Sequence, residues 1–507
     1  MKKSVTHGRR ILAVMLALMM TVGMCTALAA DSGDWSAPYM ENAQEKGWIT
    51  PEDGAVAGEA ITRASFAVML WRALGSAPSD KENPFSDVND PYYADAVITL
   101  YHQGILKGVE GSQFAPDGTL TREMAVTILA RAYNLTGDSA AIDGVFTDAA
   151  DISSWAKEAV AALAGKGYVY GVGNGQFGPK NSLTWGESAK FLSVLDSGES
   201  ASEPCDFKVI TLGTGAPPPE VGRFGPAVLV QVNGQNLLFD AGRGVMQRLY
   251  QYGLGAADVD MVFITHLHSD HTVGLPDLYL TGMLNGAFGL RTTPFKITGI
   301  EGTAQMMEYI KQAYSGDINI RMNDGEMTEE QTSIEATEFT GDGVVYERDG
   351  VTVTAIENFH GEAIDPSYGY RIDYDGRSVV ISGDTKYCEN IIEHSKGVDL
   401  LIHSVGMANE DLLKAGTPLA EKAQIVLNHH TPPEDAASVF NQTQPKLAVF
   451  NHMVVVTIAA NQFTPPTQQN VFDRTREAGY SGPLVIAKDL MIFEVGETIN
   501  VIPWIEG

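Results

Sequence analysis

Two patterns of apolar and polar residues divide the chain. In residues 31–196, apolar residues recur at helical spacing in three segments, each of which opens with a threonine: Thr62, Thr121 and Thr184. From Cys205 onward, short β-branched and apolar runs such as 207–212 and 261–265 alternate with helical stretches. The first pattern predicts capped helices and the second predicts strands followed by helices. We therefore expect an all-α N-terminal region and a larger α+β domain at residues 205–507.

The first thirty residues follow neither pattern. Four basic residues precede an uncharged apolar run at 11–24, and the small-residue motif Ala27-Leu28-Ala29 follows it. This order is typical of a secretory signal peptide, so residues 1–30 are predicted to be removed on export. The apolar run is shorter than the roughly 20 residues that span a bilayer. We expect no transmembrane segment in the mature chain.

Charge and cysteine content narrow the choice of partners. The chain carries 63 acidic and 34 basic residues, a formal net charge of -29. A polyanion such as DNA or tRNA is therefore an unfavourable partner. Beyond the signal peptide only Cys205 and Cys388 remain, without metal-ligand spacing. They are either small buried residues or one disulfide, because an exported protein meets oxidising conditions.

Residues 31–196 contain an internal repeat. Phe85-Ser86-Asp87-Val88 recurs 61 positions later as Phe146-Thr147-Asp148-Ala149, and Phe114-Ala115-Pro116 recurs as Phe177-Gly178-Pro179. A period near 60 predicts an array of similar helical units that share a core. We place three units at about 31–78, 83–138 and 144–196. A Gly-, Ser- and Glu-rich stretch at 197–204 is a predicted linker.

This repeat resembles the S-layer homology family, which fastens exported bacterial proteins to anionic secondary polymers of the cell wall. The resemblance implies a location at the bacterial cell wall or S-layer. It also implies that Arg63 and Arg122, in the family's Thr-Arg turn, bind the polymer as charge-assisted donors. Trp185 replaces the third arginine. The alternative is that the threonines are plain helix caps and the arginines are solvated.

The most informative motif follows the apolar run at 261–265. It consists of His266-Leu267-His268-Ser269-Asp270-His271. In an extended turn His266 and His268 project together, while Asp270 and His271 fall one step away. This arrangement suits two adjacent divalent ions with nitrogen and oxygen ligands. A hydroxide shared by two such ions is a nucleophile at neutral pH.

Three further metal ligands are predicted where other apolar runs end. His360 follows the run at 351–356, Asp384 follows Ile381, and His452 follows the run at 447–450. Ligands at the ends of separate strands of a rigid sheet form the kind of site that holds its geometry before a ligand arrives. The sequence therefore predicts one centre assembled from distant segments.

These motifs resemble those of the metallo-β-lactamase-fold hydrolases, whose fold is an αββα sandwich. The resemblance implies His266, His268 and His360 on one ion, Asp270, His271 and His452 on the other, and Asp384 bridging both. Asp240, in Phe239-Asp240-Ala241-Gly242, resembles the family's acidic residue that orients the ligands. Zinc is the metal expected for these ligand types, with manganese and iron as alternatives.

Within that superfamily, the motifs Leu212-Gly213-Thr214-Gly215 and Ser382-Gly383-Asp384-Thr385 resemble the ribonuclease Z group and its arylsulfatase-like relatives. Three departures argue against tRNA processing. The chain is acidic and is predicted to be exported, away from tRNA. Only 23 residues separate His360 from Asp384, where ribonuclease Z inserts a long arm that holds tRNA. The family's His-Glu-Ala-Thr motif is replaced by His403-Ser404-Val405-Gly406, without the Glu. Relatives of ribonuclease Z are commonly dimers, and the oligomeric state stays open.

His429-His430-Thr431 matches the family's His-Ser-Thr motif, whose histidine is thought to protonate the leaving group. His429 is therefore either the general acid or a structural loop histidine, since its usual Glu partner is missing. His430 and His403 are weaker candidates. Asp270 is predicted to act in catalysis as well as in metal binding.

The leading hypothesis is an exported, wall-attached dinuclear hydrolase of small esters that uses a metal-bridging hydroxide. A sulfate ester or a phosphodiester is favoured, and a lactone or carboxylic ester is an alternative. Two other hypotheses are a non-catalytic wall-binding structural or sensory protein, and a ribonuclease Z-like phosphodiesterase acting on nucleic acid. An apolar set either lines the substrate pocket or belongs to the core: Tyr279, Met283, Phe288 and Phe463.

Overall fold

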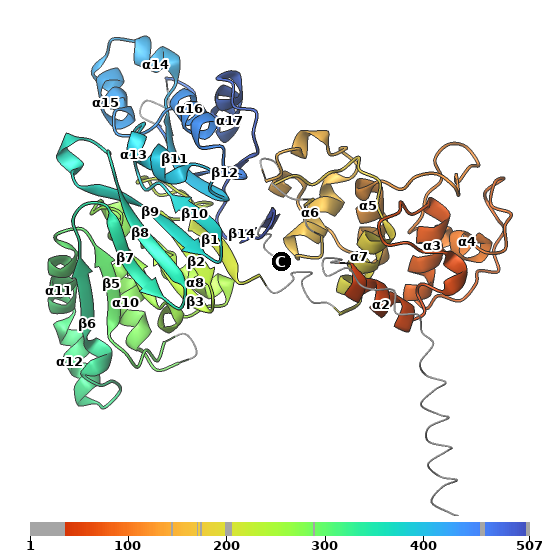
Figure 1. The fold of residues 1–507 in the computed structure, drawn as a ribbon, viewed down its shortest axis with the longest axis horizontal. Helices are drawn as coiled ribbons and strands as arrows, with labels where there is room; N and C mark the ends of the chain where they lie inside the picture. The colour runs from red at the N-terminus through yellow and green to blue at the C-terminus, as the bar shows by residue number, and fades with distance from the viewer. Residues whose placement is uncertain are drawn as a thin grey trace, which may run out of the picture. The chain divides into compact units, whose positions relative to one another are not determined.

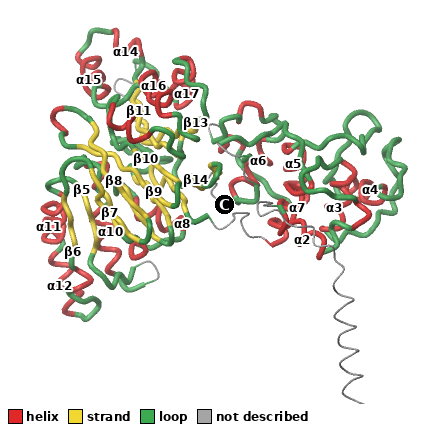
Figure 2. The backbone as a smooth tube through the Cα atoms, in the orientation of Figure 1, coloured by secondary structure: helices red, strands yellow, loops and turns green. Residues whose placement is uncertain are grey.

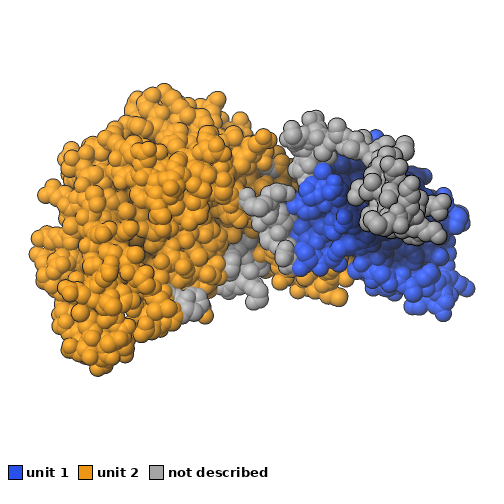
Figure 3. Space-filling model, turned by 60° about the horizontal axis from the view of Figure 1, so that its bottom comes forward, with its two compact units in different colours: residues 1–120, 182–197 blue, residues 121–181, 198–507 orange. Residues whose placement is uncertain are grey.

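The computed structural model describes residues 36–142, 145–169, 171–172, 175–197, 205–286, 289–456 and 462–502. The predicted signal peptide and residues 198–204 of the predicted linker lie outside these ranges. The chain forms two compact units, Met1–Leu120 with Ser182–Ser197 and Thr121–Asn181 with Gly198–Gly507 (Figure 3). The predicted boundaries of the repeats, the linker and the larger domain stay predictions.

The first unit is helical (Figure 1). In its core α2 packs against α7 and α3 packs against α4, around buried side chains that include Phe66 and Leu100. The cap of α3 is Thr62, whose hydroxyl accepts a hydrogen bond from the Ser65 N–H. The elements are α2 (Ala37–Glu45), η1 (Pro51–Asp53), α3 (Arg63–Ala73), α4 (Ala94–His102) and α7 (Trp185–Ser197).

The part of the second unit between residues 121 and 181 is helical too. Thr121 caps α5 as Thr62 caps α3, by accepting from the Met124 N–H. Thr184 caps α7 in the same way, so the threonine caps are confirmed in all three segments. The elements are α5 (Arg122–Ala132), η2 (Ser139–Ile142), η3 (Ala149–Asp151) and α6 (Lys157–Gly165).

The internal repeat is visible in the hydrogen bonds. The Asp87 carboxylate accepts from the Phe114 N–H at 2.9 Å, and the Asp148 carboxylate accepts from the Phe177 N–H at 2.8 Å. In each repeat an aspartate therefore fixes the turn that carries the aromatic residue. The two aspartates are 61 positions apart and the two phenylalanines 63, and because the same residue types make the same bond, the sequence repeat is also a structural repeat.

Residues from Cys205 onward form two stacked β-sheets with helices on their outer faces (Figures 1 and 2). The fold class predicted from the sequence is thereby confirmed. The first sheet has the strand order β15-β14-β1-β2-β3-β4-β5-β6. Its strands are β1 (Phe207–Gly213), β2 (Ala227–Val232), β3 (Gln235–Phe239), β4 (Met261–Phe263), β5 (Phe295–Gly299), β6 (Ile334–Glu338), β14 (Met491–Val495) and β15 (Ile499–Ile502).

The second sheet has the order β13-β12-β11-β10-β9-β8-β7. Its strands are β7 (Gly343–Arg348), β8 (Val351–Asn358), β9 (Ser367–Tyr374), β10 (Arg377–Ile381), β11 (Leu400–Met407), β12 (Leu447–Val455) and β13 (Leu484–Ile486). The strands β3 to β6 in the first sheet and β10 to β13 in the second run parallel to one another. Side chains that follow these strands can therefore gather at one edge of the sandwich.

The helices of the sandwich fall into two groups, one for each sheet. On the first sheet lie α8 (Val245–Tyr252), α10 (Leu275–Met283), α11 (Thr303–Ala313) and α12 (Ser315–Asn323). On the second lie α13 (Glu389–Ser395), α16 (Pro433–Thr443) and α17 (Gln468–Glu477). The remaining short helices are η4 (Ala256–Asp258), α9 (Ser269–Thr272), η5 (Glu330–Thr332), η6 (Glu362–Ile364), α14 (Glu410–Lys414) and α15 (Pro418–Leu427).

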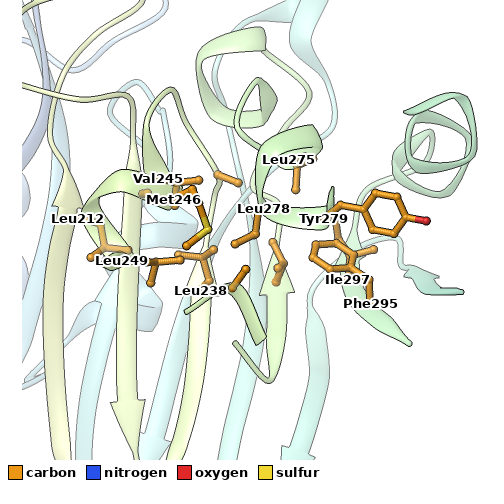
Figure 4. Close-up of a cluster of buried hydrophobic side chains, with 14 of the residues drawn as sticks. Leu212, Leu238, Val245, Met246, Leu249, Leu275, Leu278, Tyr279, Phe295 and Ile297 are labelled. Carbon is orange, nitrogen blue, oxygen red and sulfur yellow. The ribbon is translucent and has the colours of Figure 1, made fainter. Parts of the chain in front are cut away.

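The core consists of separate apolar layers. Figure 4 shows the layer under α8 and α10, where Leu249, Leu278 and Tyr279 pack against strand residues such as Leu238. Each fully buried leucine of this kind stabilises the fold by about 1.5–3 kcal/mol. Between the sheets, the Tyr370 ring lies 5.3 Å from that of Phe239. These layers fix both sheets, so residues at the strand ends are held rigidly.

Local sequence signals explain the turn between β2 and β3. Asn233 and Gly234 take φ values of 45° and 73°, the left-handed conformation that both residue types tolerate. The predicted hairpin is confirmed. Among the described residues, no helix is both long and apolar enough to cross a membrane.

Candidate metal centre

The predicted ligands come together at one edge of the sandwich. The motif His266–His271 follows β4 and enters α9, His360 follows β8, and Asp384 follows β10. All the predicted ligands are buried except His268, which is exposed. Two groups of donor atoms are close enough to hold an ion each: His266, His268 and His360, and Asp270, His271 and His452.

The first group consists of three histidine nitrogens. His268 Nδ1 lies 2.9 Å from His266 Nε2 and 3.3 Å from His360 Nε2. Two nitrogens at tetrahedral angles, each about 2.1 Å from one ion, lie about 3.4 Å apart. The observed separations are close to that value, so these three side chains fit around one divalent ion.

The second group shares its space with Asp384. Asp270 Oδ2 lies 3.7 Å from both His271 Nε2 and His452 Nε2. Asp384 Oδ2 lies 3.4 Å from His271 Nε2, 2.9 Å from His452 Nε2 and 3.7 Å from His360 Nε2. One carboxylate oxygen is therefore within reach of both groups, which is the position of a bridging ligand.

Hydrogen bonds on the far side of each ring orient the histidines. His271 Nδ1 donates to Asp240 Oδ2 at 2.7 Å, and Asp240 in turn accepts from the Thr265 N–H. His360 Nδ1 donates to the His429 carbonyl at 2.8 Å, and His452 Nδ1 donates to the Gly215 carbonyl at 2.6 Å. Because Nδ1 is used in these bonds, Nε2 is left to face the centre.

Two residues of the centre have strained backbones. Asp240 and His452 have φ values of 60° and 46°, in the left-handed region that non-glycine residues rarely occupy. The sequence predicted that His452 follows a strand that ends at Phe450. This was wrong, because β12 continues to Val455 and the register with β11 shifts between His403 and Val405. The irregularity turns His452 toward Asp384.

Unpaired buried atoms test whether the centre fits a metal ion. Asp270 Oδ2 and His271 Nε2 are buried and have no hydrogen-bond partner. Leaving such a group unpaired costs about 1–3 kcal/mol, and more when it is charged. Divalent ions bind carboxylate oxygens and imidazole nitrogens, so they would satisfy both atoms. The two His/Asp clusters are thus consistent with a dinuclear metal site.

Burial and charge act in opposite directions on the ligands. Burial lowers the pKa of His266 well below its usual value and also lowers that of His360, so both rings are neutral at pH 7. Burial raises the pKa of Asp384, but His452 and His271 outweigh it and hold that pKa well below its usual range. Burial opposes protonation of His271 and His452 too, but Asp240 and Asp384 raise the pKa of His271 and Asp384 raises that of His452, so metal binding at these two rings would displace protons.

Sequence comparisons agree with this geometry. A model of the Beta-lactamase superfamily domain matches residues 235–453, and a model of the S-layer homology domain matches residues 84–125 and 145–187. The chain is 32% identical over 290 residues to ribonuclease Z of Mycobacterium bovis BCG, covering 57% of this chain and 98% of that protein. It belongs to the metallo-β-lactamase superfamily. The larger domain is a metal-dependent hydrolase domain related to ribonuclease Z.

Other similar proteins cover the same part of the chain. Ribonuclease Z of Mycobacterium marinum is 31% identical over 289 residues, which is 57% of this chain and 99% of that protein. Among solved structures, human tRNase Z, short form, has 23% identity and a TM-score of 0.42, covering 57% of this chain and 99% of that one. A metallo-β-lactamase fold protein from Bacillus subtilis has 19% identity and the same TM-score and coverages.

The S-layer homology match covers the second and third predicted repeats, and the first stays a prediction. S-layer homology domains bind cell-wall polymers, so the hydrolase domain is preceded by a module for association with the bacterial cell surface. Arg63 and Arg122 are not solvated, as one alternative had it, but buried. Their Nε atoms donate to the carbonyls of Phe114 and Phe177. Polymer binding by these arginines stays a prediction.

The histidines outside the predicted ligand set differ in their positions. The His429 ring lies 5.7 Å from that of His360, and its carbonyl orients His360. His403 donates from Nδ1 to the Ser404 carbonyl, and burial lowers its pKa to about 4. His430, a weak candidate in the sequence, is buried with Nδ1 4.0 Å from Asp384 Oδ2. The local motif His429-His430-Thr431 points to His429, and the approach of His430 to Asp384 joins residues 46 positions apart, which the motif does not predict.

The predicted apolar set belongs to the core where it can be described. Tyr279 and Met283 are fully buried in the layer under α10, and Phe463 packs against a small cluster around Leu412. Phe288 lies outside the described residues. The interpretation of these residues as pocket lining is therefore wrong for Tyr279 and Met283, since helical spacing placed them facing the sheet.

Two cavities adjoin the metal centre. One, of about 800 Å³, is lined by His266 and His268 together with carboxylates from Glu301, Glu338 and Asp365. The other, of about 770 Å³, is lined by Gly215 and Met453, next to His452, and by the basic residues Arg223 and Lys488. A substrate that reaches the centre therefore meets acidic groups on the side of His268.

The two described cysteines are both free. Cys205 and Cys388 are each half-buried, and neither takes part in a disulfide. Burial raises the pKa of the Cys205 thiol, so it is a poor nucleophile at neutral pH.

Proposed function

We propose that this chain is a ribonuclease Z-like, metal-dependent phosphodiesterase displayed at the bacterial cell surface. The observation that carries the proposal is the placement of Asp384 between two groups of three ligands, in a domain that spans nearly the whole length of ribonuclease Z. This support favours a phosphodiester over the sulfate ester, lactone and other carboxylic ester that the sequence left open. It also argues against a non-catalytic wall-binding protein, since the donor set is complete.

Two divalent ions, with zinc as the first candidate, would supply an activated water and would stabilise negative charge on the phosphoryl oxygens. His266, His268 and His360 would hold one of them, and Asp270, His271 and His452 the other. Asp384 keeps the two groups at a fixed separation. The rest of the chain positions these residues through Asp240 and the backbone carbonyls of Gly215 and His429.

Protonation of the leaving group is assigned to His429. Its backbone is fixed by the bond from His360, so its half-buried ring stays beside the first ligand group. A histidine that is within reach of the leaving oxygen is an effective general acid. Ser404 stands where the family motif has glutamate, and its hydroxyl group carries no negative charge.

RNA is the first substrate to test, because proteins similar to this chain in sequence include ribonuclease Z. A second candidate is a small phosphodiester, and two observations favour it. The carboxylates of Glu301, Glu338 and Asp365 on the His268 side disfavour a long polyanion. In addition, residues 361–383 fold into η6, β9 and β10 as part of the sheet, so this segment forms no arm that could hold tRNA.

The deciding experiment measures hydrolysis by the mature chain loaded with zinc or manganese. The substrates are bis-p-nitrophenyl phosphate, an RNA oligonucleotide, a tRNA transcript, p-nitrophenyl sulfate and a lactone. Asp270→Ala is the test variant. His394→Ala, a histidine distant from the motif residues, is the matched control.

Cleavage of a phosphodiester that disappears in Asp270→Ala and persists in His394→Ala supports the proposal. Cleavage of RNA assigns the first substrate class, and cleavage of bis-p-nitrophenyl phosphate without RNA assigns the second. Turnover of the sulfate ester or the lactone alone overturns the phosphodiesterase. Metal binding without any turnover would favour the non-catalytic alternative.

Attachment to the cell wall is tested separately. The full mature chain should sediment with purified bacterial cell walls and should stay in solution when the anionic polymer has been removed from them chemically. Equal sedimentation with stripped and intact walls would contradict polymer binding by the repeats. Size-exclusion chromatography of the same preparation shows whether the chain is a dimer.

A further inference from the structure

The metal centre contains one more unpaired buried nitrogen than its predicted ligands explain. His430 is 8% exposed, and its Nδ1 has no hydrogen-bond partner. The other unpaired buried atoms among the donors of the centre are Asp270 Oδ2 and His271 Nε2, which belong to predicted ligands. A buried polar atom without a partner is costly, and one that faces a metal site is satisfied by the ion. His430 shares this property with two of the predicted ligands, Asp270 and His271.

The position of His430 is fixed by its loop. Thr431 donates from Oγ1 to the Thr385 carbonyl at 2.8 Å, directly beside Asp384 in the chain. The Gly406 N–H donates to the Thr431 carbonyl at 2.9 Å. These bonds hold the loop against β11 and the strand end that carries Asp384, so the His430 ring has one stable place.

Two departures from the ribonuclease Z motifs lie next to each other at this point. His430 stands where the family's His-Ser-Thr motif has serine, and Gly406 stands where its His-Glu-Ala-Thr motif has threonine. A Cβ atom added at Gly406 would lie 2.7 Å from the His430 Cβ, a distance that real structures essentially never show. Serine has a Cβ atom too, so this contact requires glycine at 406 whichever of the two residues stands at 430, and it shows how closely the His430 loop lies against β11.

The position of the His430 ring suits metal binding. A neutral imidazole has one ring nitrogen with a free lone pair, and Nδ1 of His430 is a nitrogen without a hydrogen-bond partner. The donor atoms of His360, Asp384 and His430 all lie within 4.8 Å of one another. Two ligand atoms on opposite sides of one ion, each about 2.1 Å from it, are about 4.2 Å apart. The 4.0 Å between His430 Nδ1 and Asp384 Oδ2 is within that limit.

We propose that His430 is an additional nitrogen ligand of the ion held by His266, His268 and His360. The inference rests on the metal centre of the proposed function and is independent of the substrate. This ion would then have one more protein ligand than the family's His-Ser-Thr motif can supply, because that motif has serine at the position of His430. The ion would thereby lose a position that water or substrate could otherwise occupy.

The test replaces the proposed ligand nitrogen of His430 by a cysteine sulfur, whose bond to a metal ion can be seen in an absorption spectrum. His430→Cys in the full mature chain is loaded with Co²⁺, because a thiolate bound to Co²⁺ gives a charge-transfer band in the near ultraviolet. The expected result is a new band that the wild-type chain lacks. His429→Cys is the matched control in the same loop and should give no such band. A His430→Cys variant that binds two Co²⁺ ions without the band overturns the inference.

A second variant removes the donor. His430→Ser, which restores the family's residue, is expected to lower the affinity for one of two ions at least tenfold in competition with a chelator. His429→Ser should leave both affinities unchanged. Unchanged affinities and an unchanged Co²⁺ spectrum in His430→Ser also overturn the inference. A wild-type chain that binds two ions and cleaves no phosphodiester would refute only the proposed function, since these readouts measure metal binding alone.

Discussion

Buried polar groups are treated differently in the helical repeats and in the metal centre. In the repeats, the buried charged side chains Arg63, Arg122 and Glu123 all have hydrogen-bond partners within the protein. In the centre, Asp270 Oδ2, His271 Nε2 and His430 Nδ1 have none. Burial costs desolvation energy in both regions, and these three charged groups of the repeats recover it from partners within the protein. Single unpaired atoms also occur elsewhere, such as Trp71 Nε1 and Thr147 Oγ1 in the repeats, so it is the gathering of three unpaired donor atoms at one centre that points to an ion.

The contrast also changes how the repeats are understood. A sequence motif that resembles a polymer-binding turn suggests exposed arginines, yet the Arg63 guanidinium lies over the Phe114 ring at 4.6 Å and donates to backbone carbonyls. The arginine thus holds the turn of the following repeat to its own helix. The same contact is made by Arg122 with Phe177. These contacts stabilise the fold whether or not the polymer also reaches the guanidinium groups.

The largest expected effect comes from Asp270→Asn. This variant should lose one metal ion and more than about 100-fold of the hydrolytic activity, because loss of a ligand exceeds the 10–100-fold cost of losing a group behind a ligand. The metal-free variant should be about as stable as metal-free wild type, because Asp270 Oδ2 accepts no hydrogen bond and lies 3.7 Å from its neighbouring histidine nitrogens. Mass spectrometry of bound metal and melting curves after EDTA treatment measure both. A metal-free variant that is less stable than metal-free wild type would show that Asp270 stabilises the fold without an ion.

Asp240→Asn should have the next largest effect. Asn still accepts the Thr265 N–H but no longer offers a charge to His271 Nδ1, so the ring is held less firmly. We expect metal affinity to fall by about 10–100-fold, measured by chelator competition. Asp260→Asn is the control, because Asp260 accepts from the Asn236 N–H at the opposite end of β3. An equal loss of affinity in both variants would contradict the role of Asp240.

Arg63→Met tests whether the hydrogen bonds of a buried arginine stabilise the helical repeats. The variant keeps an apolar stem but leaves the Phe114 and Lys107 carbonyls without their donor, which should cost about 2 kcal/mol of stability. Bound metal and hydrolysis should not change. Lys107→Met, an exposed side chain on the same turn, is the control and should stay within about 0.5 kcal/mol of wild type. Denaturant unfolding gives both values.

The smallest expected effect is a pH dependence. His403 has its pKa lowered by burial to about 4, below the roughly 6.5 of an unfolded histidine. Its contribution to stability is present above pH 6.5 and declines as the pH falls toward 4, because the unfolded chain binds the proton more tightly. Between pH 6.5 and 5.5 the loss should be about 1 kcal/mol.

Denaturant unfolding of metal-free protein at several pH values measures this loss. The His403→Gln variant should have a shallower dependence on pH by that amount over the same interval. An identical dependence in the variant and in wild type would show that the fold does not keep His403 neutral.

Much of the fold and most of the candidate site followed from local patterns. The hexapeptide from His266 to His271 places four donors within six residues, so its chemistry needs no distant partner to be noticed. The capping threonines and the Asn233-Gly234 turn are equally local, because each acts on backbone groups within a few positions. His360 and Asp384 could be predicted because each follows an apolar run that ends at the edge of the sandwich where the metal centre lies.

Other features could not be read in this way. The turn of β12 at His452 arises from a register shift against β11, and register is decided by the neighbouring strand. Tyr279 and Met283 carry the same apolar pattern whether they line a pocket or a core, and the packing of α10 on the sheet decides between them.

The sequence by itself determined the fold class, the helical repeat and the identity of seven clustered donors, because periodicity and spacing act through neighbouring residues. Only the tertiary structure decided which buried groups are paired and which are not. It turned Arg63 and Arg122 toward backbone carbonyls and brought His430 to 4.0 Å from Asp384. The physical reason is that a hydrogen bond or a ligand contact depends on distance in space, which chain order does not specify for residues dozens of positions apart.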